Sequence, residues 1–124
     1  MTSAFERWES EAWSILTPLM AALNVADRVA RGPEAVLAIS DQFRALSQDA
    51  AIWISENPCP ASDLAILFTM LVRSYGTAAD SLAAEAKNPN GADWSAIDRE
   101  FAGLHNALPE TLSTMRASGG VSRT

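Results

Sequence analysis

The sequence predicts an all-α protein folded as an up-down-up-down four-helix bundle. Apolar residues recur at three- and four-residue steps in four long stretches of the 124-residue chain, which is the spacing that lines one face of an α-helix. Three short segments rich in proline, glycine or asparagine separate those stretches, and alanine, a strong helix former, is abundant. Four helices with short connections pack most simply as antiparallel neighbours.

The first helix is predicted to begin near Ala4, because Ser3 and Glu6 have the spacing of a capping box. Pro18 lies inside this helix and removes the hydrogen bond to the Ser14 carbonyl oxygen, which predicts a kink. The apolar stripe of the helix consists of Phe5, Trp8, Ala12, Ile15, Leu19, Ala22, Ala26 and Val29, widened by Leu16, Met20 and Leu23.

The second helix is predicted to begin at Pro33, because proline suits the first helical position and Gly32 closes the preceding helix. Residues 57–60, Asn-Pro-Cys-Pro, form a rigid break after it. Trp8, Trp53 and the start of the third helix should then meet at one end of the bundle as part of the core. The stripe of the second helix consists of Val36, Ile39, Phe43, Leu46, Ala50 and Trp53.

The third helix is predicted over residues 61–87 and the fourth from near Asp93, with a turn at 88–91 between them. Pro109 removes the bond to the His105 carbonyl oxygen, so the fourth helix should kink as the first does. One domain is predicted over residues 1–118, followed by a flexible tail over 119–124. The two inner faces are Leu64, Phe68, Leu71, Tyr75, Ala78 and Leu82 in the third helix, and Trp94, Ile97, Phe101, Leu104, Leu108, Leu112 and Met115 in the fourth.

The third helix is apolar on more than one side, since Thr69 is the only polar residue over 64–72. A helix packed on one face needs only an apolar stripe, and this run is far too short to cross a bilayer. At about 100° per residue, Ile66 and Met70 point away from the inner face. They are either ordinary surface residues or a surface that binds a second copy or another protein. The candidates for that contact are Trp13, Ile66, Leu67, Met70 and Val72.

Charge and composition limit the classes of function. The net charge is -6 and no basic stripe is present, which argues against general nucleic-acid binding. Acidic residues near the N-terminus do not match a signal peptide, so a cytoplasmic protein without a membrane span is predicted. The single cysteine, Cys59, cannot form an internal disulfide. At a helix N-terminus it could be a reactive thiol or a small apolar residue.

Few residues support an enzymatic function. His105 is the only histidine. A carboxylate-bridged di-metal site needs histidines on two helices and is excluded, and a tetrahedral zinc site is nearly excluded for lack of ligands. No metal and no cofactor are therefore predicted. Arg99 and His105 have a spacing found in HEPN ribonucleases, and a metal-independent ribonuclease is therefore the enzymatic alternative. A second alternative is a bundle that binds an apolar small molecule in a cavity opened by the proline kinks.

Four segments between residues 36 and 108 form an ordered set: Phe43, Leu46 and Asp49; the break at 57–60; the apolar run from Leu64 to Arg73; and Ile97, Asp98, Arg99, Phe101, Gly103 and Leu104. In this order they resemble the FlaF family of alphaproteobacterial flagellar biosynthesis regulators. The resemblance implies a helical, non-enzymatic regulator or chaperone of flagellin synthesis or export that acts through protein contacts. Together with the third helix, it leads to the prediction of a protein–protein interaction module with flagellin as a candidate partner.

Overall fold

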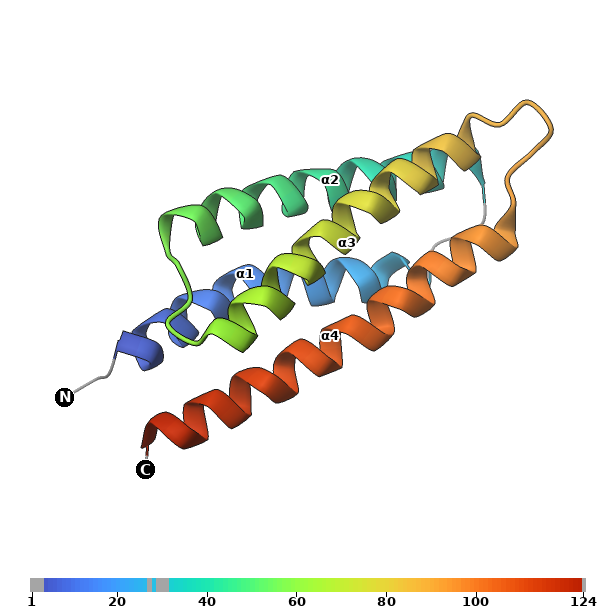
Figure 1. Ribbon diagram of the computed structural model, residues 1–124. Coiled ribbons are helices and arrows are strands. Elements are labelled where there is room, and N and C mark those ends of the chain that lie inside the picture. The colour runs from blue at the N-terminus through green and yellow to red at the C-terminus, as the bar shows by residue number, and fades with distance from the viewer. Residues whose placement is uncertain (1–3, 27, 29–31, 124) are drawn as a thin grey trace.

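The computed structural model describes residues 4–26, 28 and 32–123, with side chains up to residue 117, and it contains four helices (Figure 1). The all-α class is confirmed, and the described residues contain no strand. The up-down-up-down order and the two proline kinks stay predictions, and Val29 lies outside the described residues. The helices are α1 (Ala4–Ala26), α2 (Pro33–Glu56), α3 (Ser62–Ala86) and α4 (Trp94–Arg123).

The helices begin close to where the sequence predicts. Pro33 opens α2 after an extended Gly32. Before α4, the carboxylate of Asp93 accepts a hydrogen bond from the Ala96 backbone N–H at 3.2 Å, as an N-cap does. In the preceding turn Gly91 has a φ of 93°, a conformation that glycine adopts without steric cost. The α4 backbone stays helical through Gly119 and Gly120 to Arg123, so the helix ends later than predicted.

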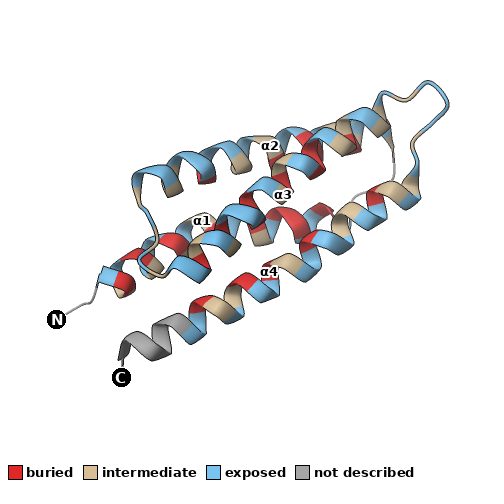
Figure 2. Ribbon diagram, in the orientation of Figure 1, coloured by how far each residue is buried: buried red, intermediate tan, exposed pale blue. Residues whose placement is uncertain are grey.

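Each helix packs against two neighbours, in the cycle α1–α2–α3–α4 and back to α1. Large side chains in the centre of the bundle connect the helices that are not neighbours, α1 with α3 and α2 with α4. Tyr75 of α3 donates a hydrogen bond from its hydroxyl to the Leu19 carbonyl oxygen of α1, at 2.8 Å. Phe43 of α2 lies edge-on to Phe101 of α4, with ring centroids 6.2 Å apart. Buried residues therefore line the inward side of all four helices (Figure 2).

Aromatic residues close one end of the bundle, as the sequence predicts. The rings of Trp8, Trp53 and Phe68 are in mutual contact, with centroids 5.5 to 5.9 Å apart. The indole N–H of Trp8 donates to the Asn57 carbonyl oxygen at 2.7 Å, so buried tryptophan keeps a hydrogen-bond partner. This contact ties α1 to the connection between α2 and α3.

The α2–α3 contact is close because small residues line it. Ser40 is fully buried and donates to the Ala79 carbonyl oxygen at 2.6 Å, and Ser47 donates to the Val72 carbonyl oxygen at 2.9 Å. A Cβ atom on Gly76 would lie only 3.1 Å from the Ser47 hydroxyl oxygen. The glycine and the two serines therefore allow the helix backbones to approach each other.

Candidate functional site

The outer side of α3 carries two exposed apolar residues. Ile66 is 60% exposed and Met70 is 56% exposed, although residues of their size usually add more stability when buried. They lie four residues apart, which is about one helical turn, so the two side chains are neighbours on one face. The structure thus places both residues at the surface, as the sequence predicts.

The other three predicted contact residues do not belong to this exposed face. Val72 is only 5% exposed and belongs to the core, because the close α2–α3 contact covers its side of the helix. Trp13 is half-buried on α1, which lies across the bundle from α3 and packs against α2 and α4. Leu67 is half-buried at the edge of the face. Val72 is therefore a core residue, and Trp13 lies on a helix that does not pack directly against α3.

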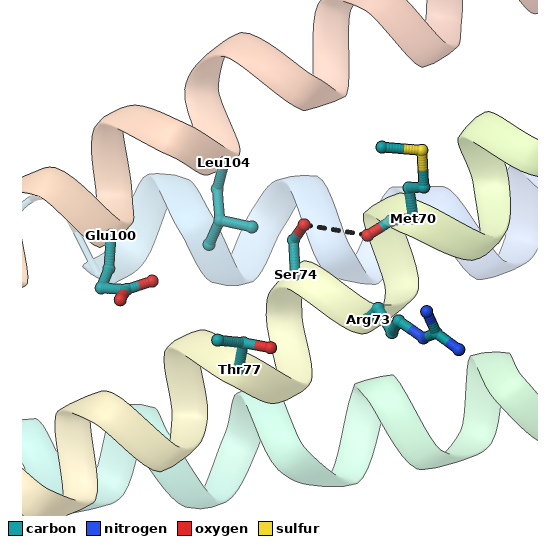
Figure 3. A pocket seen from close by; sticks show the side chains of 6 residues that line it. All are labelled: Met70, Arg73, Ser74, Thr77, Glu100 and Leu104. Carbon is teal, nitrogen blue, oxygen red and sulfur yellow. Dashed lines mark hydrogen bonds between the residues drawn. The ribbon is translucent and has the colours of Figure 1, made fainter.

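A groove of about 340 Å³ lies beside Met70, between α3 and α4 (Figure 3). Leu104 reaches into it from α4, and Arg73 points away from α4. Glu100 accepts a hydrogen bond from the Ser81 hydroxyl at 3.0 Å, which holds this carboxylate on the α3 side of α4. The lining residues are Met70, Arg73, Ser74, Thr77, Glu100 and Leu104. The groove therefore combines apolar and small polar groups with one charge of each sign.

The outer face of α3 is nearly uncharged beside this groove. Between Asp63 and Asp80 the sequence contains a single charged residue, Arg73. Asp80 is paired with Arg44 of α2 at 3.0 Å, at the far end of the face. Burying an unpaired charge opposes binding. The middle of the face can thus contact an apolar surface at little such cost, because it carries few charges.

Two further large apolar residues are exposed on other helices, and the sequence analysis did not single them out. Val25 on α1 is 55% exposed and Ile52 on α2 is 57% exposed. Scattered exposure of this kind is ordinary in proteins. The pair on α3 differs because its members are adjacent and Met70 lines a groove. Val25 and Ile52 therefore provide matched controls for substitutions on α3.

The two residues of the ribonuclease alternative, Arg99 and His105, lie on the same helix, α4. Arg99 and His105 are both exposed on α4, and six residues along a helix rotate two side chains about 120° apart. Among the described residues no group of three or more histidine, cysteine or acidic side chains is arranged to hold a metal ion.

Cys59 is half-buried in the connection between α2 and α3. Desolvation by burial raises the pKa of its thiol, and the smaller effect of a backbone hydrogen bond from Ala61 lowers that pKa. Because the thiolate is the reactive form, the raised pKa favours the interpretation of Cys59 as a small apolar residue.

A second hollow, of about 430 Å³, lies between the start of α1 and the α2–α3 connection. Its lining includes Arg7, Trp8 and Glu56. Neither this hollow nor the α3–α4 groove is lined by Pro18 or Pro109. The small-molecule alternative, which places a cavity at those prolines, therefore gains no support from these two hollows.

Comparison with known proteins gives no relative: no family model, no curated protein and no solved structure matches the chain. The resemblance to FlaF regulators stays a prediction. None of the described helices is long and apolar enough to span a membrane.

Proposed function

We propose that this protein is a non-enzymatic protein–protein interaction module that binds another protein through the outer face of α3. The observation that carries the proposal is the adjacent pair Ile66 and Met70, both more than half exposed, of which Met70 lines a groove. Binding a partner would remove this apolar surface from water, which is the main favourable contribution to most protein association. Exposed apolar patches beside polar groups are typical of such contacts.

The biological role that we propose is regulation or chaperoning of flagellin synthesis or export in the cytoplasm. The support is the ordered resemblance to FlaF regulators, and the segment from Leu64 to Arg73 in that resemblance contains both exposed residues. Flagellin is therefore the first partner to test.

The test is a quantitative pull-down from extracts of the source organism, with the wild type compared with the double substitution Ile66→Asp and Met70→Asp. We expect a protein that the wild type captures to be lost, because a carboxylate in an apolar contact must be desolvated without a partner. A loss of at least about 100-fold in affinity, or roughly 2.7 kcal/mol, is expected for two such charges. Mass spectrometry of the captured proteins, with flagellin looked for first, provides the measurement.

The matched control is the double substitution Val25→Asp and Ile52→Asp, which adds the same charges at residues of similar exposure. The control variant should capture the same partner as the wild type. Circular dichroism should show equal helicity in all three proteins. Identical sets of captured proteins from all three would contradict the proposed docking surface.

A further inference from the structure

We draw no further inference here: the strongest candidate, the hollow of about 430 Å³ between the start of α1 and the α2–α3 connection, is lined by the exposed charged residues Arg7, Glu11 and Glu56, and nothing in the structure shows what would occupy it.

Discussion

Replacing Phe43 with alanine is expected to lower the free energy of unfolding by about 3–5 kcal/mol, the range for truncating a buried phenylalanine. Phe43 is fully buried on α2. Its ring contacts Tyr75 of α3 at a centroid distance of 5.1 Å and Phe101 of α4 at 6.2 Å. The substitution leaves a cavity where three helices meet, and domains of this kind are stable by only about 5–15 kcal/mol in total.

Urea denaturation followed by tryptophan fluorescence measures this loss, since the chain has four tryptophans. The control is Ile52→Ala on the same helix, where the side chain is exposed and the expected change is within about 0.5 kcal/mol. Equal losses for the two variants would mean that Phe43 does not occupy the junction of α2, α3 and α4.

The second large effect is expected at high pH and comes from Tyr75. Burial raises the pKa of Tyr75 well above its ordinary value near 10. Its hydroxyl must also stay protonated to donate to the Leu19 carbonyl oxygen. Because the folded-state pKa is the higher one, this stabilisation is complete below pH of about 10 and is lost as pH rises towards the folded-state pKa. The free energy of unfolding should fall by up to about 1.4 kcal/mol per pH unit in that window.

Tyr75 is the only tyrosine in the chain, so the near-ultraviolet absorbance of tyrosinate reports on it alone. We expect that absorbance to appear only as helical circular dichroism is lost. Tyr75→Phe should be about 1 kcal/mol less stable at neutral pH, from the missing hydrogen bond, and its alkaline unfolding should be shallower. Tyrosinate that forms near pH 10 in a fully helical protein would contradict the buried position of this residue.

The helices and most of the core follow from the sequence, because a single periodicity determines which residues share a face. All six inner-face residues predicted for α3, from Leu64 to Leu82, are buried. Pro33 and Asp93 mark the start of α2 and α4 through local backbone chemistry. These features depend only on neighbouring residues and are therefore visible before the fold is known.

The sequence analysis missed features that depend on how a neighbouring helix packs. Ser40 is polar, and its burial is favourable only because the Ala79 carbonyl oxygen of α3 accepts its hydrogen bond. Val72 lies at the edge of the α3 stripe, and it is covered because Gly76 and Ser47 let α2 approach closely. Neither the partner of a buried hydroxyl nor the distance between two helices is encoded in the apolar pattern of one helix.

The candidate site also has one part that the sequence predicts and one part that it does not. The outward direction of Ile66 and Met70 follows from the helical angle, so the sequence was sufficient to predict both. The groove also needs Glu100 and Leu104, which come beside Met70 only through the register of α4 against α3. Sequence reasoning therefore found the exposed pair on α3 and missed the groove beside it.

Site-specific photo-crosslinking in cells of the source organism tests the proposed docking surface on α3 most directly. A benzoylphenylalanine residue is placed at Ile66 or Met70 in one set of strains, and at Val25 or Ile52 in the control set. We expect a crosslinked adduct with another protein from positions 66 and 70 and none from positions 25 and 52. Absence of an adduct from 66 and 70, or equal adducts from all four positions, would contradict a docking surface on α3.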